Sequence, residues 1–239
     1  MMSFLRRARC SAVIAAGGSS GRMDRSDKLF LEIGGVPVLA RAVSAFAGCG
    51  RIDELIVAVR RDSLERAAEL CGEYARGKSV KLVEGGDTRL RSVYNGVFAA
   101  SRSSRLIAIH DGARPFVSAE LIERSITAAG EYGAAAPAIP VVSTVKKVEG
   151  GIIKCTVERE GMYEMQTPQV FESGIIKAAL TDALKKSLPV TDDCMAVEAM
   201  GFPIHIVCGD RCNIKITTPE DAAIAEAMAS AGVTHGGAR

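Results

Sequence analysis

The sequence lacks the features that mark a membrane protein or a protein that binds nucleic acid through bulk charge. None of its apolar runs approaches the ~18 consecutive residues of a membrane-spanning helix. The formal net charge of the 239 residues is only +2, which indicates no polyanionic partner. Hydrophobic residues make up 48% and charged residues 24%, as in a globular protein with a sizeable core. We therefore expect neither a membrane nor a nucleic acid as a partner.

The seven cysteines show neither a zinc pattern nor a disulfide framework. Their number is odd and several lie in apolar periodic segments, which indicates buried free thiols in a reducing compartment. Cys208 and Cys212 lie near His205, but no second ligand pair follows at zinc spacing. The basic stretch Arg6–Arg9 leads into an apolar run and then glycines, without a small-residue cleavage site. We expect a cytoplasmic protein.

Apolar strand-like runs alternate with helical patterns along most of the chain. Strands are expected at Cys10–Ala16, Glu54–Val59, Val80–Val83, Leu106–Ile109 and Ala134–Ile139. Helices are expected over Asp62–Arg76 and from Pro37, as first helical residue, to about Ala47. This alternation predicts an α/β fold, a single Rossmann-like domain with a mostly parallel sheet. The domain is expected to span residues 1–230, followed by a disordered tail at 231–239.

One stretch, residues 141–159, breaks the alternation and has the pattern of a protruding β-hairpin arm. Two runs of strand-favouring residues, Val141–Val148 and Ile152–Glu158, flank the turn Gly150-Gly151. A lone hairpin is marginal in water. The arm therefore needs either the domain body or a second subunit to pack against.

The most informative segment is a glycine-rich loop after the first expected strand. Residues 15–23 are Ala-Ala-Gly-Gly-Ser-Ser-Gly-Arg-Met, and Lys28 follows. Glycines let backbone N–H groups approach a phosphate, and Arg22 and Lys28 are able to neutralise its charge. The loop fits neither the P-loop nor the dinucleotide pattern. It indicates a nucleoside triphosphate site, with an ordinary glycine-rich turn as the alternative.

A second polar segment follows the expected strand at Leu106–Ile109. Asp111 is suited to bind a hydroxyl or a metal, and Arg114 to pair with a phosphate. A solvated turn that ends in proline is the alternative. His110 is interpreted as structural rather than catalytic.

Three other segments are open to two interpretations each. Gly85-Gly86-Asp87, with Ser92 five residues on, suits a nucleobase edge or a helix N-cap at Asp87. Thr191-Asp192-Asp193 is a site segment or a helix start. Lys215, in an expected short apolar strand, either extends to solvent or points at an anion. The next segment has the capping pattern of a helix start, with Thr218 as N-cap.

The chain shows no Ser/His/Asp or Cys/His arrangement for nucleophilic catalysis. Its candidate groups are cations, namely Arg22, Lys28, Arg114, Arg159 and Lys215. Phosphoryl chemistry depends mostly on positioning and charge stabilisation, so this inventory fits a nucleotidyl transfer.

Taken in order, these segments resemble the 2-C-methyl-D-erythritol 4-phosphate cytidylyltransferase family. The matching pieces are Ala15 through Lys28, Gly85-Gly86-Asp87, His110–Pro115, Thr144-Val145-Lys146, Thr156–Arg159, Thr167-Pro168-Gln169, Thr191-Asp192 and Asn213–Thr217. The resemblance implies cytidylyl transfer from CTP to the polyol phosphate, with release of pyrophosphate, in non-mevalonate isoprenoid synthesis. Ribitol 5-phosphate cytidylyltransferase and a noncatalytic nucleotide-binding subunit are the alternatives.

The resemblance also assigns roles to single residues. It implies catalytic roles for Arg22, Lys28, Arg159 and Lys215. It implies nucleotide contacts at Ala15, Ala16, Gly17, Gly18, Gly86, Asp87 and Ser92, and substrate contacts at Asp111, Arg114, Thr144, Thr167 and Thr191. Mg²⁺ is the implied cofactor, held mainly through the CTP phosphates with no certain protein ligand. Family members are homodimers whose arms reach the partner's site, so a homodimer with arm exchange is expected.

Overall fold

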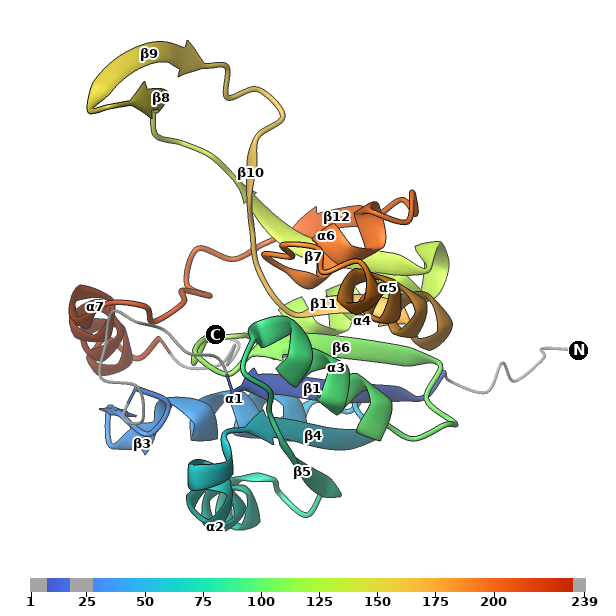
Figure 1. Cartoon of the computed structure of the whole chain (residues 1–239). Coiled ribbons are helices and arrows are strands. Elements are labelled where there is room, and N and C mark those ends of the chain that lie inside the picture. The colour runs from blue at the N-terminus through green and yellow to red at the C-terminus, as the bar shows by residue number, and fades with distance from the viewer. Residues whose placement is uncertain (1–7, 18–27, 234–239) are drawn as a thin grey trace, which may run out of the picture.

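The computed structural model describes residues 8–17 and 28–233, and a mixed β-sheet forms its centre (Figure 1). The strands of this sheet are β1 (Cys10–Ala16), β4 (Glu54–Val59), β5 (Val80–Glu84), β6 (Leu106–Asp111), β7 (Ala134–Pro140), β10 (Tyr163–Met165), β11 (Gln169–Glu172) and β12 (His205–Cys208). Their order is β10-β7-β11-β6-β1-β4-β5, and β12 pairs with β7. The pairs made by β1, by β4 and β5, and by β12 are parallel, whereas β10 and β11 run antiparallel to their neighbours. The predicted α/β fold with a mostly parallel sheet is confirmed.

Helices cover both faces of the sheet. They are α1 (Val38–Gly48), α2 (Leu64–Tyr74), α3 (Arg89–Ala99), α4 (Ala119–Tyr132), α5 (Ser173–Lys185), α6 (Asp193–Glu198) and α7 (Pro219–Ser230), with a 3-10 turn at Arg61–Ser63. Successive strand residues face opposite sides, so Ala12 and Ile14 pack with α1, α2 and α4. Val13 packs with α3, α5 and α6 on the other side. The central strands are buried on both faces, which explains their continuous apolar runs.

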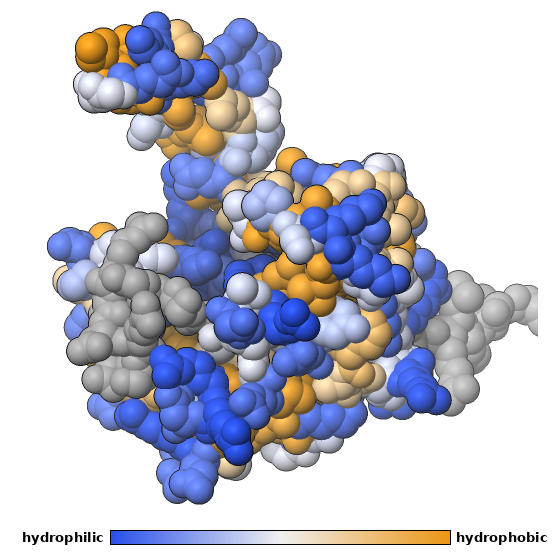
Figure 2. Space-filling model, viewed as in Figure 1, coloured by the Kyte–Doolittle hydropathy of each residue, from blue (hydrophilic) through white to orange (hydrophobic). Residues whose placement is uncertain are grey.

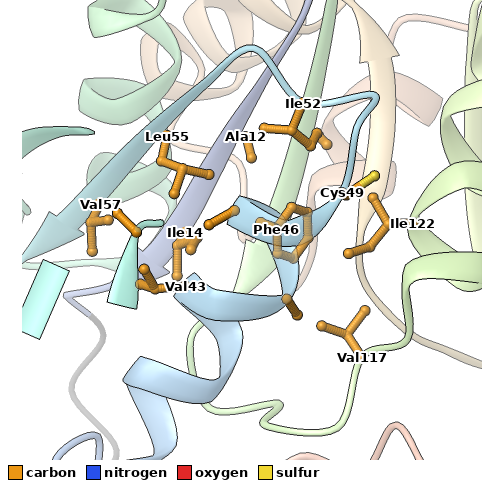
Figure 3. Packing of buried hydrophobic residues seen from close by; sticks show 14 of the residues in the cluster. Ala12, Ile14, Val43, Phe46, Cys49, Ile52, Leu55, Val57, Val117 and Ile122 are labelled. Carbon is orange, nitrogen blue, oxygen red and sulfur yellow. The ribbon is translucent and has the colours of Figure 1, made fainter. Parts of the chain in front are cut away.

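The core on the first face is centred on Phe46 of α1. Its ring is fully buried. It lies among Ile14 of β1, Ile52 of the loop before β4 and Ile122 of α4 (Figure 3). It also contacts the ring of His110 at 4.9 Å between centroids. The apolar core thus reaches the end of β6, where the polar segment begins.

Several element bounds differ from the sequence predictions. β6 continues to Asp111 rather than stopping at Ile109, and Pro37 precedes α1 instead of starting it. The helix expected over Asp62–Arg76 is shorter, because it begins after the 3-10 turn and ends at Tyr74. The strand expected around Lys215 is wrong: there the Ile216 N–H bonds the Ala113 carbonyl in a loop, outside any strand ladder.

The arm is the hairpin of β8 (Val145–Glu149) and β9 (Ile152–Val157), which pair antiparallel. Gly150 and Gly151 have φ of 58° and 79°, which matches the tight hairpin turn that the sequence predicted. Figure 1 shows that β8 and β9 project away from the main sheet. The protruding hairpin arm is confirmed.

Two remaining features complete the described chain. A small ribbon of β2 (Glu32–Ile33) and β3 (Val36–Pro37) precedes α1, and α7 contacts β2. Within residues 8–17 and 28–233, no helix has both the length and the apolar character needed to cross a membrane. Most of the expected tail, residues 234–239, lies outside the described residues.

Candidate active site

The candidate site lies at the carboxyl ends of the parallel strands β6, β1, β4 and β5. Their register aligns Ala15 with Asp111, and Ala16 with Val59. Ligands of open α/β sheets bind at this edge. The structure therefore brings Gly17, the Gly85-Gly86 turn and Asp111 to one edge of the sheet; the rest of the glycine loop, residues 18–27, lies outside the described residues.

Glycine is required where the loops after β1 and β5 meet. A Cβ on Gly17 would lie 2.8 Å from the Ser92 hydroxyl and 3.3 Å from the Gly85 Cα. The fully buried Ser92 accepts a hydrogen bond from the Gly86 N–H at 3.0 Å and donates to the Thr88 carbonyl. Ser92 thus fixes the backbone of the predicted nucleobase loop.

The sequence left open that Asp87, at the end of this loop, is a helix N-cap; the structure gives that role to its neighbour. Thr88, not Asp87, is the N-cap of α3, because its side chain accepts from the Arg91 N–H. Asp87 is exposed beside it. A capping role therefore does not explain Asp87, and its predicted contact with the nucleotide stays a prediction.

Asp111 forms the centre of a cluster of cations, which we call the Asp111 cluster and which comprises Asp111, Arg89, Lys215, Arg114 and Lys28. The Lys215 ammonium donates to Oδ2 at 2.7 Å and Arg89 Nε donates to Oδ1 at 3.1 Å. Arg114 Nε lies 3.8 Å from Oδ2. Burial alone would raise the pKa of Asp111, but the charges of Arg89, Lys215 and Arg114 hold it well below its usual value. Asp111 is therefore a buried carboxylate that remains ionised.

Lys28 belongs to the cluster through its charge. Burial lowers the pKa of Lys28, and the nearby Lys215 ammonium lowers it further, while Asp111 acts in the opposite direction. Two lysines that repel one another beside a single carboxylate are arranged to receive more negative charge. Arg22 and Gly18 lie outside the described residues, so their predicted roles remain predictions.

A chain of hydrogen bonds through His110 and Thr167 holds the backbone of Asp111. Burial lowers the pKa of His110 to about 4, so its ring is neutral near pH 7. His110 Nε2 lies 3.2 Å from the Arg114 carbonyl and must carry the hydrogen, because a carbonyl only accepts. The Thr167 hydroxyl then donates to Nδ1 at 2.9 Å and accepts from the Asp111 N–H at 3.2 Å. Both side chains are engaged within the protein.

Arg114 and Asn213 tie the cluster to the segment before α7. Arg114 donates to the Asn213 carbonyl at 2.7 Å, and the Asn213 amide nitrogen donates to the Thr167 carbonyl at 2.8 Å. Burial lowers the pKa of Arg114, although Asp111 opposes that shift. Arg114 Nε and Asn213 Oδ1 are buried without a hydrogen-bond partner among the described residues.

Sequence reasoning missed Arg89, and it left Asp193 within a segment that was either part of the site or a helix start. Arg89, the first residue of α3, donates from Nη1 and Nη2 to the Asp193 carboxylate at 3.0 and 2.7 Å. The Asp193 side chain is only 1% exposed. The available signal for Asp193 was its place, next to Asp192, directly before the apolar run at residues 194–197. Thr191 itself is exposed, and Asp192 caps α6, so the helix start expected there is confirmed.

The structure does not bring the arm residues to the Asp111 cluster. Thr144 is exposed, and the exposed Arg159 donates to the Val142 carbonyl at the base of the arm. No hydrogen bond joins the described residues of the arm to the Asp111 cluster. The predicted roles of Thr144 and Arg159 stay predictions.

The family is decided by comparison with known proteins. A family model described as 2-C-methyl-D-erythritol 4-phosphate cytidylyltransferase matches residues 10–231. A relative of that name from Caldanaerobacter subterraneus subsp. tengcongensis is 43% identical over 219 residues, covering 90% of this chain and 96% of the relative. Another, from Geobacillus thermodenitrificans, is 39% identical over 225 residues, covering 94% and 98%. The chain belongs to this family. It is a cytidylyltransferase, as the order of its motifs predicted.

Solved structures of the family share the fold. The 4-diphosphocytidyl-2C-methyl-D-erythritol synthase of Anaerococcus prevotii matches with a TM-score of 0.82 at 30% identity, covering 94% of this chain and 99% of that one. The 2-C-methyl-D-erythritol 4-phosphate cytidylyltransferase of Thermus thermophilus matches with a TM-score of 0.77 at 35% identity, covering 92% and 98%. Family membership therefore extends from sequence to fold over almost the whole chain.

Proposed function

We propose that this chain transfers the cytidylyl group of CTP to 2-C-methyl-D-erythritol 4-phosphate and releases pyrophosphate, as a step of non-mevalonate isoprenoid precursor synthesis. The observation that carries the proposal is the Asp111 cluster at the strand edge of a chain of this family. Two mutually repelling lysines, Lys28 and Lys215, gain most when phosphates arrive between them.

The chemical step needs charge stabilisation more than acid–base catalysis. An oxygen of the polyol phosphate forms a bond to the α-phosphorus of CTP. The bond from that phosphorus to the bridging oxygen of the β-phosphate breaks, and pyrophosphate leaves with the electron pair. A phosphate monoester is already anionic near neutral pH, so no side chain must remove a proton from it. Lys28 and Arg22 are proposed to stabilise the charge at the α-phosphorus, and Lys215 to hold the substrate phosphate.

The nucleotide and polyol occupy neighbouring parts of the edge in this proposal. CTP lies over Ala15, Ala16 and Gly17, with its base against the Gly86-Asp87 turn. The close approach of Gly17 and Gly85 leaves their backbone open to a ligand. The polyol hydroxyls lie near Asp111, whose carboxylate is ionised and suited to accept hydrogen bonds.

Mg²⁺ is proposed as the cofactor, bound mainly to the CTP phosphates. Proteins commonly hold Mg²⁺ by one or two carboxylates together with substrate phosphates. Residues 8–17 and 28–233 contain no group of three or more metal-ligating side chains, so they offer no cage of their own. Asp111, the carboxylate at the strand edge, already accepts hydrogen bonds from Arg89 and Lys215, so the CTP phosphates supply the main ligands in this proposal. When bound, the ion would neutralise part of the triphosphate and pyrophosphate charge.

A homodimer with exchanged arms is proposed to complete the site. The arm carries four strongly exposed apolar side chains, Val142, Val148, Ile152 and Ile153, and Figure 2 shows hydrophobic surface on it. A two-stranded hairpin with such a surface needs a partner, and C2 dimers are the commonest closed assembly. In the dimer, Thr144 and Arg159 would reach the substrate phosphate at the partner's Asp111 cluster.

The compartment proposed is the cytoplasm. The seven cysteines are all free thiols in the structure, and four of them are buried. Free thiols suit a reducing environment. The proposed reaction also consumes CTP, which is available in the cytoplasm.

A pyrophosphate-release assay tests the proposed reaction. The purified protein is given Mg²⁺, one nucleoside triphosphate and either 2-C-methyl-D-erythritol 4-phosphate or ribitol 5-phosphate. CTP with the first polyol phosphate should give the highest kcat/KM, because a base that leaves buried donors and acceptors unpaired is penalised. Equal turnover of CTP, UTP, ATP and GTP would contradict the base site. Preference for ribitol 5-phosphate would contradict the substrate.

A further inference from the structure

We propose that Arg89 is a positioning residue that fixes the Asp111 carboxylate, so that one oxygen is left for Lys215 and the polyol. This proposal deepens the proposed function and rests on it. Arg89 was not among the residues to which the sequence assigned a role. It does not need to touch either substrate to act.

The first step of the argument is how Arg89 distributes its donors. Two guanidinium nitrogens form a bidentate pair with Asp193, and the third, Nε, donates to Asp111 Oδ1. Burial would lower the pKa of Arg89, but the Asp193 and Asp111 carboxylates raise it well above its usual value. The guanidinium is therefore a permanent cation with a fixed orientation.

The second step is that the far end of this pair is rigid. Asp193 is fully buried, and Gln169 Oε1 of β11 accepts hydrogen bonds from the Asp193 and Cys194 N–H groups at 3.0 Å each. Gln169 Nε2 also donates to the Asp192 carboxylate at 2.8 Å. The start of α6 is thereby fastened to the central sheet and serves as the anchor of Arg89.

The third step concerns Asp111. With Oδ1 held by Arg89, the carboxylate presents Oδ2 to the Lys215 ammonium at 2.7 Å. Without Arg89 the carboxylate would rotate freely, and Lys215 would be the strongest partner for both oxygens. An ammonium held by two oxygens of one carboxylate is less available to a substrate phosphate. Arg89 thus limits the attraction between Asp111 and Lys215.

Arg89 also links the two halves of the proposed site. It follows directly after Thr88, the cap that ends the nucleobase loop, and its side chain reaches the strand edge at β6. The position of the loop and the orientation of Asp111 are therefore fixed by the same residue. If Arg89 only joined α3 to α6, its bonds to Asp193 would be enough, and the bond to Asp111 would not be needed.

The test separates positioning from structural support. The variant pair Arg89→Met with Asp193→Asn removes both charges together, which avoids leaving an unpaired buried carboxylate. Arg102→Met, on the exposed loop after α3, is the matched control. The first readout is the KM for the polyol phosphate, compared with the KM for CTP in the same variant.

The expected effect follows from the geometry of the Asp111 carboxylate. Loss of Arg89 leaves Oδ1 without its fixed partner, so the direction in which Oδ2 faces the polyol is no longer defined. The KM for the polyol phosphate should rise on the order of 10-fold, more than the KM for CTP.

Two further measurements keep the proposal decidable. The NMR chemical shift of the Asp111 carboxyl carbon in the free protein at pH 7 should change in the double variant, because Oδ1 has lost a hydrogen bond. If the double variant does not fold, Arg89→Lys decides instead: it keeps the charge but not the three-bond fork, and its KM for the polyol phosphate should rise several-fold. An unmoved Asp111 carboxyl signal, or an unchanged KM in Arg89→Lys, overturns the role of Arg89. Absence of pyrophosphate release by the wild type overturns the proposed function instead, and the carboxyl signal still tests Arg89.

Discussion

The Asp111 cluster and the hairpin arm are built in opposite ways. Asp111 is 7% exposed; it accepts hydrogen bonds from α3 and from the segment before α7, and its N–H donates to Thr167. On the arm, Ile152 and Ile153 are 66% and 61% exposed, and the two strands pair only with each other. The Asp111 carboxylate is bonded on both oxygens within one chain, whereas the arm exposes apolar surface that one chain does not cover.

The comparison teaches where each kind of charge can be used. Cations in the cluster are fixed by buried partners and are suited to stabilise a transition state without reorganisation. Arg159 on the arm is exposed and bonded to the Val142 carbonyl, so in the proposed dimer it binds substrate only after a partner chain has fixed the arm. The predictions that follow test this contrast, beginning with the largest expected effect.

Removing a cation from the cluster should have the largest effect on catalysis. Lys28→Ala is expected to lower kcat by on the order of 10²–10³, the usual loss for one preorganised transition-state donor. Arg22→Ala should lower it similarly. Lys186→Ala is the matched control. It removes an exposed lysine at the end of α5 and should leave kcat unchanged. Full kcat in Lys28→Ala, with circular dichroism like that of the wild type, would refute the role given to Lys28.

Removing the cation on the arm should act on substrate binding. Arg159→Ala is expected to lower kcat/KM for the polyol phosphate about 10- to 100-fold, as for loss of one charged hydrogen bond, chiefly through KM. Lys154→Ala, also exposed on the arm, is the control. A kcat defect as large as that of Lys28→Ala, with KM unchanged, would show that the arm and the cluster do not differ in this way.

Mixing the two variants tests whether the arm serves its own chain. Heterodimers of Arg159→Ala and Lys28→Ala would hold one site with both defects and one with neither. After random exchange about a quarter of all sites should be intact, which the pyrophosphate assay detects. Subunit exchange is verified by a mass tag on one variant. No recovery after verified exchange would show that each arm completes its own site.

The sequence predicted the fold better than it predicted the site. Strands β1 and β4 have the predicted bounds because buried parallel strands are continuous apolar runs that glycine or charge interrupts. The order of motifs predicted the family. Lys215 was placed in a strand because its neighbours are apolar, yet those neighbours pack against α7 and the loop after β6.

The pairing of Arg89 with Asp193 was beyond sequence reasoning for a physical reason. The two residues are 104 positions apart, and each alone resembles an ordinary charge near a helix start. Only the packing of α3 beside α5 and α6 brings them together and buries them. The proposed contact of Arg159 with the cluster of a second chain is an arrangement between chains, which one sequence does not describe.

A smaller effect is expected from crowding the backbone of the site. Gly17→Ala places a Cβ 2.8 Å from the Ser92 hydroxyl, so the turn that Ser92 holds must shift. Destabilisation by about 1–3 kcal/mol is expected, as for overpacking, with a higher KM for CTP. Gly174→Ala, in α5 with open space around it, is the control. Unchanged urea unfolding and an unchanged KM for CTP in Gly17→Ala would show that the close approach is not needed.

The smallest effect is expected from the N-cap of α7, the helix that follows the segment carrying Lys215. Thr218 caps α7 by accepting from the Asp221 N–H, and Asp221 in turn accepts from the Thr218 N–H at 2.8 Å. Thr218→Ala should cost about 1 kcal/mol of unfolding free energy, the typical value of an N-cap. Ser230→Ala, at the other end of α7, should cost almost nothing. Hydrogen bonds from Thr217 and Thr218 hold the pKa of Asp221 below its usual value, although burial opposes this.

The sign of the pH dependence follows from that depressed pKa. A carboxylate whose pKa is lower in the folded state stabilises the protein above its unfolded pKa, and this stability is lost as the pH falls through the folded value. The loss caused by Thr218→Ala should therefore be larger at pH 7 than under acidic conditions, because the cap and the carboxylate act together. Urea unfolding of the wild type, Thr218→Ala and Ser230→Ala at several pH values measures this loss. A loss that does not depend on pH would show that Thr218 acts without Asp221, and that the segment carrying Lys215 is held by apolar packing against α7 alone.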